Sequence, residues 1–368
     1  MGGRLGDCVK IPAPVEIDLD FWKRRRVLVT GHTGFKGAWL ALWLQSLGAT
    51  VTGVARGAPA RPSLHRLAGV GAHMHELSVD VRDAPAVRDA LLRARPEVVL
   101  HLAAQPLLRR SLLAPAKTYE VNVMGTVNVL DAVRQVGHDV LSVVVVTSDK
   151  CYENLGERSR RFVEDDPLGG SDPYSSSKAC AELLTSAYRR SFFDGGDSPR
   201  LATARAGNVV GGGDWGEDRL VPDTVRAVEA GTPLKLRNPR AVRPWQHVLS
   251  PLSGYLRLAE ALSKDGGREA ARAWNFGPPE LDARPVSWII ERLAELWAGE
   301  LTWELDERAN SPEAGHLALD SGAAERTLGW RPACELEQAL GLTVQWHRAH
   351  RRGEDMRALS LAQIASLG

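Results

Sequence analysis

The sequence contains few cysteines, and they form neither a metal-binding motif nor a disulfide framework. Its 368 residues include 4 cysteines, at Cys8, Cys151, Cys180 and Cys334. Their spacing matches neither a metal-binding motif nor the disulfide framework of a small secreted domain. We therefore expect reduced thiols in a cytoplasmic protein, and no bound metal.

The chain also lacks an excess of charge and any long apolar run. Its 46 basic and 45 acidic residues give a net charge of +1, whereas nucleic-acid-binding proteins usually carry a strong basic excess. No stretch is apolar enough to cross a bilayer, and residues 1–20 lack the apolar core of a secretion signal. We expect no nucleic-acid or membrane partner, and a flexible extension over residues 1–20.

From residue 24 onward the sequence alternates between short apolar runs and segments with helical periodicity. Strands are predicted at 26–30, 50–54, 77–81, 97–102, 141–147 and 201–206, and helices at 38–47, 84–95, 118–135 and 172–191. This alternation predicts an α/β fold with a Rossmann-type, doubly wound parallel sheet.

After Asn208 the pattern becomes irregular, with short elements predicted at 221–230, 234–236, 274–276, 286–297 and 302–305. We interpret this part as a smaller, discontinuous substrate domain over the carboxyl edge of the sheet. The predicted dinucleotide-binding domain comprises residues 21–207 and 239–270. The substrate domain comprises 208–238 and 271–368, with the ligand between the two.

A glycine-rich turn follows the first predicted strand and opens the first helix. It reads Gly31-His-Thr33-Gly34-Phe35-Lys36-Gly37. Glycines permit a tight turn and a close approach of the backbone to a ligand, and the helix N-terminus offers free N–H groups. The turn therefore predicts a site for the pyrophosphate of a dinucleotide.

Two further motifs carry groups that can transfer protons. Ser148-Asp149-Lys150 ends a run of valines, at the strand end where open α/β sheets perform chemistry. Tyr174 and Lys178 lie four residues apart and so share one face of a helix. A nearby ammonium and the positive ring of a bound dinucleotide together favour the phenolate of Tyr174. An acid, an amine and a phenol brought together indicate proton transfers at several positions of one substrate.

These motifs resemble the extended short-chain dehydrogenase/reductase superfamily, and within it the nucleotide-sugar 4,6-dehydratases. The segments TSDKCY (147–152), HTGFKG (32–37) and DPYSSSK (172–178) are similar to the CDP-glucose branch of that family. Lys150 stands where most of these dehydratases carry glutamate. The resemblance extends from Phe21 over nearly the whole chain.

The resemblance implies NAD as the cofactor. It places Asp80 and Val81 near the adenine, the backbone of 102–104 along the cofactor, and Asn122 near the active site. The usual NAD-selecting carboxylate is missing from the end of the second strand, where Arg56 follows Ala55. NADP therefore remains an alternative. The implied cofactor contacts are Gly31, Thr33, Gly34, Phe35, Lys36, Gly37, Arg56, Asp80, Val81, Leu102, Ala103, Ala104, Asn122, Tyr174 and Lys178.

The resemblance also implies a reaction, from CDP-glucose to CDP-4-dehydro-6-deoxyglucose plus water. Tyr174 would take the proton of the 4-hydroxyl as hydride passes to NAD, while Lys178 holds the nicotinamide ribose and lowers the pKa of Tyr174. Ser148 would bind the 4-oxygen, and Asp149 would protonate the departing 6-hydroxyl. Lys150 would either remove the C5 proton or stabilise the enolate. A 4-epimerase, a reductase and a non-catalytic sensor are the alternatives.

Arginines are the preferred donors to a diphosphate, because their guanidinium groups bind it with paired, charge-assisted hydrogen bonds. The resemblance favours Arg243 first, then Arg219 and Arg237, although an arginine taken singly is more often a surface residue. Gln105 and His247 could contact the ligand or fill structural roles. The expected substrate contacts are Gln105, Asn208, Arg219, Arg237, Arg243 and His247. Relatives associate through the helices that carry Asn122 and Tyr174, which implies a homodimer or a homotetramer.

Overall fold

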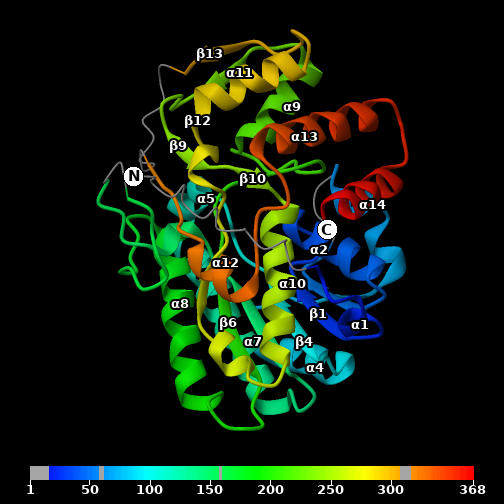
Figure 1. Ribbon diagram of the computed structural model, residues 1–368, viewed down its shortest axis with the longest axis vertical. Helices are drawn as coiled ribbons and strands as arrows, with labels where there is room; N and C mark the ends of the chain where they lie inside the picture. The colour runs from blue at the N-terminus through cyan, green and yellow to red at the C-terminus, as the bar shows by residue number, and fades with distance from the viewer. Residues whose placement is uncertain (1–15, 58–61, 157–159, 307–315) are drawn as a thin grey trace, which may run out of the picture.

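A seven-stranded parallel sheet forms the centre of the protein (Figure 1). The computed structural model describes residues 16–57, 62–156, 160–306 and 316–368. The sheet has the order β11-β6-β5-β4-β1-β2-β3, and every pair of neighbours is parallel. Its strands are β1 Arg26–Thr30, β2 Thr50–Ala55, β3 His75–Ser78, β4 Val98–His101, β5 Ser142–Val146, β6 Arg200–Arg205 and β11 Ala273–Asn275. The Rossmann-type prediction is confirmed.

The strands are apolar on both faces because helices cover both sides of the sheet. Val144 and Val146 of β5 belong to one core, and the alternate residues Val143 and Val145 belong to the other. The first core contains α2 (Phe35–Ser46) and α10 (Leu249–Ser263). The second contains α4 (Ala84–Ala94) and α7 (Gly125–Val136), with part of α8 (Pro173–Phe192) packed against it.

The sheet changes its winding direction at β1, which pairs with β2 on one side and β4 on the other. The loops that follow β1 and β4 therefore separate at their carboxyl ends and leave a crevice, the usual ligand position in such sheets. The N-terminus of α2 and the loop after β4 both open onto this crevice. The fold itself thus determines where the site lies.

A third apolar core lies outside the large sheet, at the top of Figure 1. It contains side chains of α9 (Leu220–Ala230), α11 (Val286–Leu296) and α13 (Leu336–Arg351). Three two-stranded sheets accompany it, namely β7 (Val209–Val210) with β10 (Gln246–His247), β9 (Val242–Pro244) with β12 (Ala283–Pro285), and β8 (Leu234–Leu236) with β13 (Trp303–Leu305). This part of the chain forms the wall of the crevice opposite the sheet.

Several predicted boundaries are wrong. The strand at 273–275 pairs with β6 as the edge of the large sheet, although the sequence interpretation placed it in the substrate domain. The third strand begins at His75 and ends at Ser78, because its partner β2 ends at Ala55. The helix predicted at 118–135 is α6 (Pro115–Tyr119), a π-helical turn at Glu120–Met124 and α7 in succession.

The chain from residue 16 to residue 20 is ordered rather than flexible. Ile17 is buried, and Asp18 caps α1 (Leu19–Trp22) by accepting a hydrogen bond from the Phe21 N–H at 3.0 Å. The backbone N–H of Asp18 also donates to Glu260 at 3.1 Å. The rest of the predicted extension, residues 1–15, lies outside the described residues. Within the described ranges, no helix is long and apolar enough to cross a membrane.

Candidate active site

A cavity of about 1000 Å³ lies at the carboxyl end of the sheet. It gathers most of the residues that the sequence singled out, although they come from segments far apart in the chain. Those that line it are Gly31, Thr33, Gly34, Phe35, Lys36, Gly37, Arg56, Asp80, Val81, Leu102, Ala103, Ala104, Ser148, Asp149, Lys150, Tyr174, Lys178, Asn208, Arg219, Arg237 and Arg243. Gln105, Asn122 and His247 do not line the cavity.

The glycine-rich loop forms one end of the cavity and needs its glycines for close backbone approach. Gly31 has a φ of 74°, and a Cβ atom there would lie 2.9 Å from the Ala103 Cα. A Cβ atom on Gly37 would lie 2.2 Å from the Gly31 carbonyl oxygen. Gly34 precedes α2 without a side-chain cap, so the first N–H groups of the helix are available to a ligand. The loop therefore fits a pyrophosphate.

Tyr174 occupies the first turn of α8, which Asp172 fixes. The Asp172 carboxylate accepts hydrogen bonds from the N–H groups of Tyr174 and Ser175 at 2.9 and 3.0 Å, and Pro173 takes the first helical position. Burial raises the pKa of Tyr174 to about 12, although its hydrogen bond with Ser148 opposes this. The predicted lowering of this pKa is thus absent from the protein alone, because desolvation outweighs every favourable contact.

Lys178 lies one helical turn after Tyr174 and extends beneath the end of β5. Its ammonium donates a hydrogen bond to the Val146 carbonyl oxygen at 3.2 Å. Burial lowers the pKa of Lys178 to about 8, while the charge of Glu182 opposes the shift. The amine therefore remains charged near neutral pH and supplies a positive charge inside the cavity.

Asp149 lines the cavity beside Ser148 and Lys150. It follows β5 in a short 3₁₀ turn, is 2% exposed, and accepts a hydrogen bond from the Ser148 hydroxyl at 2.9 Å. Its other oxygen, Oδ2, is buried and has no hydrogen-bond partner among the residues that the structure describes. Burial raises the pKa of Asp149, although Lys150 opposes the shift. This shift favours the protonated form relative to an exposed aspartate, which suits a group that donates a proton.

Space for the Asp149 carboxyl depends on a glycine after β6. A Cβ atom on Gly207 would lie 2.8 Å from Asp149 Oδ2 and 2.7 Å from Pro244 Cγ. Only glycine therefore leaves both neighbours in place. The glycine in the run Ala206-Gly207-Asn208 is thus required for steric reasons.

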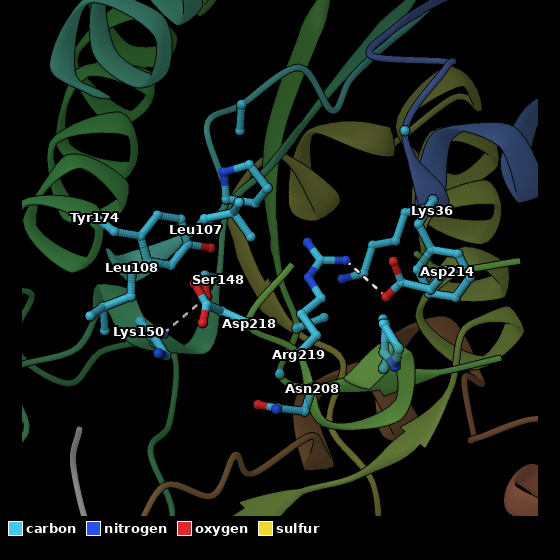
Figure 2. A pocket seen from close by; sticks show the side chains of 18 of the residues that line it. Lys36, Leu107, Leu108, Ser148, Lys150, Tyr174, Asn208, Asp214, Asp218 and Arg219 are labelled. Atoms are coloured by element: carbon cyan, nitrogen blue, oxygen red, sulfur yellow. Dashed lines mark hydrogen bonds and ion pairs between the residues drawn. The ribbon is translucent and has the colours of Figure 1, made fainter. Parts of the chain in front are cut away.

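Cationic groups lie near Tyr174 and Asp149 in the cavity (Figure 2). The Lys150 ammonium lies 6.0 Å from the centroid of the Tyr174 ring, and Lys150 is half-buried. Burial lowers the pKa of Lys36 to about 8, although the charge of Asp149 opposes this. Figure 2 shows Ser148, Lys150 and Tyr174 at one side of the cavity, and Lys36, Asp214 and Arg219 at the other. A polyanionic ligand would find positive charge along the whole length of the cavity.

The three predicted arginines line the end of the cavity away from the sheet, and acidic residues hold two of them. Arg219 donates to Asp214 at 3.0 Å, and Arg237 lies 3.5 Å from Asp218. Arg243 is buried, and its guanidinium donates to the Val242 carbonyl oxygen at 2.9 Å. Neither aspartate was among the predicted site residues. Asp214 lies in the Gly-Asp-Trp run at 213–215.

Gln105 and Asn122 hold each other beside the cavity. The Gln105 N–H donates to Asn122 Oδ1 at 2.7 Å, and the Asn122 amide returns a bond to the Gln105 carbonyl oxygen at 3.1 Å. The Asn122 amide also reaches Ser177 Oγ at 2.9 Å, and the Gln105 amide donates to Thr118 Oγ1 at 3.1 Å. Through Asn122, these bonds fix the loop after β4 to α8, the helix that carries Tyr174.

His247 is fully buried beside Trp39, away from the cavity lining. Its Nδ1 accepts a hydrogen bond from the Leu249 N–H at 3.3 Å. Burial lowers the pKa of His247 to about 3, so the imidazole is neutral. The structure thus gives this histidine a place at the start of α10, not in the cavity.

A buried ion pair supports the strand end from below, and the sequence analysis did not find it. Glu182 and Arg205 are each 3% exposed, and their side chains lie 2.8 Å apart. Glu182 also accepts hydrogen bonds from Thr147 and from Thr203, the latter at 2.7 Å. The pair joins α8 to the ends of β5 and β6, directly beneath Ser148 and Asp149.

This fold and cavity are those of a short-chain dehydrogenase/reductase of the type that acts on nucleotide sugars. The chain belongs to the GDP-mannose 4,6 dehydratase family, which matches residues 28–343. A CDP-glucose 4,6-dehydratase of Salmonella typhimurium is 47% identical over 353 residues, which cover 95% of this chain and 98% of the relative. A dTDP-glucose 4,6-dehydratase of Streptomyces griseus is 32% identical and covers 74% of this chain and 77% of its own length.

Solved structures agree with the family. A double mutant of dTDP-glucose 4,6-dehydratase from Streptomyces venezuelae, crystallised with NAD bound, has a TM-score of 0.75 at 25% identity. It is matched over 88% of this chain and 98% of that structure. A UDP-glucose 4-epimerase from Thermus thermophilus in complex with NAD has a TM-score of 0.74 at 27% identity, over 88% of this chain and 99% of that structure.

Proposed function

We propose that the protein is a CDP-glucose 4,6-dehydratase, which converts CDP-glucose to CDP-4-dehydro-6-deoxyglucose and water. The observation that carries the proposal is Asp149, a buried carboxyl with one free oxygen beside Ser148 and Tyr174. Expulsion of the 6-hydroxyl needs such an acid, whereas epimerisation at C4 does not. The choice of CDP is supported by the 47% identical relative that carries this activity in its name.

NAD is the cofactor that we propose, and it would lie along the loop at 31–37 with its nicotinamide near Tyr174. When bound, it would accept a hydride from the sugar and return it, so that no net oxidation occurs. Asp80, Val81 and the backbone at 102–104 line the part of the cavity beyond β2 and β4. Arg56 lies at the same end, where it would favour a 2′-phosphate, so a comparison of NAD with NADP belongs to the first assays.

The residues around Tyr174 provide the proton transfers. With a pKa of about 12, Tyr174 becomes a base only when positive charge is added beside it, and an oxidised nicotinamide supplies such charge. Ser148 shares a hydrogen bond with Tyr174 and would hold the 4-oxygen of the sugar. Asp149, whose pKa is raised by burial, would then donate a proton to the departing 6-hydroxyl.

Lys150 remains with two proposed roles, either as the base that takes the C5 proton or as the charge that stabilises the enolate. Its position over the Tyr174 ring, at 6.0 Å, suits both. Lys150→Ala should slow C5 solvent exchange and elimination but leave the first hydride transfer intact. Unchanged turnover in this variant would remove Lys150 from the mechanism.

One assay tests the proposed reaction against its alternatives. The protein is incubated with CDP-glucose and catalytic NAD, and the product is analysed by mass spectrometry. Loss of one water with a 4-keto product supports the proposal, whereas no change in mass with inverted C4 indicates an epimerase. Stoichiometric consumption of reduced cofactor indicates a reductase, and no reaction indicates a binding protein. Competition among CDP-, dTDP- and GDP-glucose then tests the base preference.

We further propose a cytoplasmic homodimer, or a homotetramer, assembled through α7, α8 and the π-helical turn before α7. Met124 and Leu183, on these helices, are 51% and 59% exposed, which supports an apolar contact there. Val129 belongs to the second core instead, and so faces the sheet. Sedimentation of the wild-type chain and of a Leu183→Glu variant tests the interface, because a charge at its centre should shift the chain toward monomer.

A further inference from the structure

Two histidines and a glutamate meet on the far side of the glycine-rich loop. His32 Nε2 lies 2.7 Å from Glu76 Oε1, and His65 Nε2 lies 2.8 Å from the same oxygen. The imidazole rings are 5.6 Å apart and 67° inclined to each other. The three residues come from the loop, from α3 (Leu64–Leu67) and from β3, so the fold alone brings them together.

The two histidines of this cluster are buried, whereas the glutamate is exposed to solvent. The His32 and His65 side chains are 3% and 9% exposed, whereas the Glu76 side chain is 40% exposed. Within the described part of the chain, the Nδ1 atoms of both rings are buried without a hydrogen-bond partner. Two glycines make room for it, because a Cβ atom on Gly53 would lie 2.4 Å from the His32 ring and one on Gly71 would lie 2.2 Å from Glu76 Oε2.

The donor set is one that transition metals prefer. Two imidazole nitrogens and one carboxylate oxygen lie within 4.8 Å of one another. Zinc binds such ligands in tetrahedral geometry at about 2.0–2.2 Å, often with water in the fourth position. We propose that His32, His65 and Glu76 form a binding site for a divalent transition metal ion, of which zinc is the best match.

The geometry allows a metal ion to enter with little movement. Ligands of a tetrahedral zinc ion are separated by about 3.3 Å, so the two nitrogen–oxygen distances must each increase by roughly half an ångström. Glu76 can make this adjustment because its side chain is largely exposed. The same opening to solvent gives the ion its route in and leaves its fourth position to water.

The site would join the cofactor loop to two other elements. His32 lies between Gly31 and Thr33, which line the cavity, while its own side chain points to the opposite side of the loop. A metal held there would fix this loop to α3 and β3. The proposal does not depend on the proposed reaction, because it can be tested without substrate.

The test uses the full-length protein, freed of metal by a chelator and then titrated with zinc against a chromophoric competitor. We expect one zinc ion per chain at micromolar concentration or tighter. His65→Gln and Glu76→Gln should each weaken binding by at least tenfold, in line with the loss of one of three ligands. Cobalt in place of zinc should give visible absorption bands that disappear in His65→Gln.

His75→Gln is the matched control, because His75 is an exposed histidine on β3 adjacent to Glu76. It should bind zinc as the wild type does. Circular dichroism confirms that each variant is folded before titration. Absence of stoichiometric zinc binding in the wild type would overturn the proposal and leave the cluster as a hydrogen-bonded brace. Equal losses in His65→Gln and His75→Gln would overturn it as well.

Discussion

Replacement of Asp149 by asparagine is the sharpest test of the proposed mechanism, because it removes a proton while it keeps the shape. The Asp149 carboxyl is 2% exposed, and its Oδ2 has no hydrogen-bond partner in the described ranges of the chain, so an amide nitrogen at that position breaks no bond observed there. The hydrogen bond from Ser148, at 2.9 Å, persists to the remaining oxygen. The buried amide N–H groups would cost about 1–3 kcal/mol of stability.

The expected loss of activity follows from the role of a general acid. Such groups contribute about 10²- to 10⁴-fold to rate, which corresponds to about 3–5 kcal/mol of transition-state stabilisation. Asp149→Asn should therefore lower the turnover of CDP-glucose by that factor. The first hydride transfer, which needs Tyr174, should continue, so reduced cofactor should accumulate instead of appearing transiently.

Single-turnover absorbance of the reduced nicotinamide measures this directly. Tyr174→Phe is the control that should show no reduced cofactor at all. The pKa of Asp149 is raised, so its acid form is present below that pKa and is lost as pH rises. The alkaline fall of wild-type turnover should accordingly be absent from Asp149→Asn. Turnover within about threefold of the wild type, or failure to form reduced cofactor, would refute the assignment of Asp149 as the acid.

Three further predictions concern the surroundings of this acid. Gly207→Ala should lower turnover by about 10- to 100-fold with little change in cofactor affinity, because its Cβ atom would lie 2.8 Å from Asp149 Oδ2; a wild-type rate would contradict this. Glu182→Leu should lower the free energy of unfolding in urea by about 3–5 kcal/mol, since it leaves the Arg205 charge buried alone. Addition of Arg205→Met should recover most of that loss, and failure to recover would refute the ion-pair explanation. Lys36→Met should raise the free energy of unfolding near neutral pH by about 1–3 kcal/mol. The pKa of Lys36 is about 8 in the folded protein and 10.5 for an exposed lysine, so this gain should shrink as pH rises between those values. A gain independent of pH would contradict the explanation by burial of a charged lysine.

The sheet was predictable because each central strand is a continuous apolar run between turn signals. Val143 to Val146 shows this clearly, since residues buried on both faces leave no alternation to misinterpret. The edge strand at 75–78 has no such run, and it was placed two residues too late. The strand at 273–275 was found, but its partner was not, because pairing with β6 is a property of the folded chain.

Within the site, local motifs were predictable and long-range partners were not. The glycine loop and the Tyr174–Lys178 pair each lie in one short segment whose spacing carries the signal. Glu182 and Arg205 stand 23 residues apart on different elements, and no spacing rule connects them. The cluster of His32, His65 and Glu76 was not predicted either, because its members come from three separate segments. The rise in the pKa of Tyr174 in the protein alone was not evident from the sequence, because a sequence shows a neighbouring charge but not the depth of burial.

The position of the irregular segment in the chain has a consequence for how such proteins diversify. The chain leaves the sheet after β6 and returns in α10, which packs against β5 and β6, before β11 pairs with β6. Residues 206–248, which carry Arg219, Arg237 and Arg243, thus form an insertion whose two ends both lie next to β6. Insertions or exchanges within it leave the pairing of every strand in the sheet untouched. The residues at the end of β5 and in α8 can therefore be kept while the segment that would bind the nucleotide part of the substrate changes.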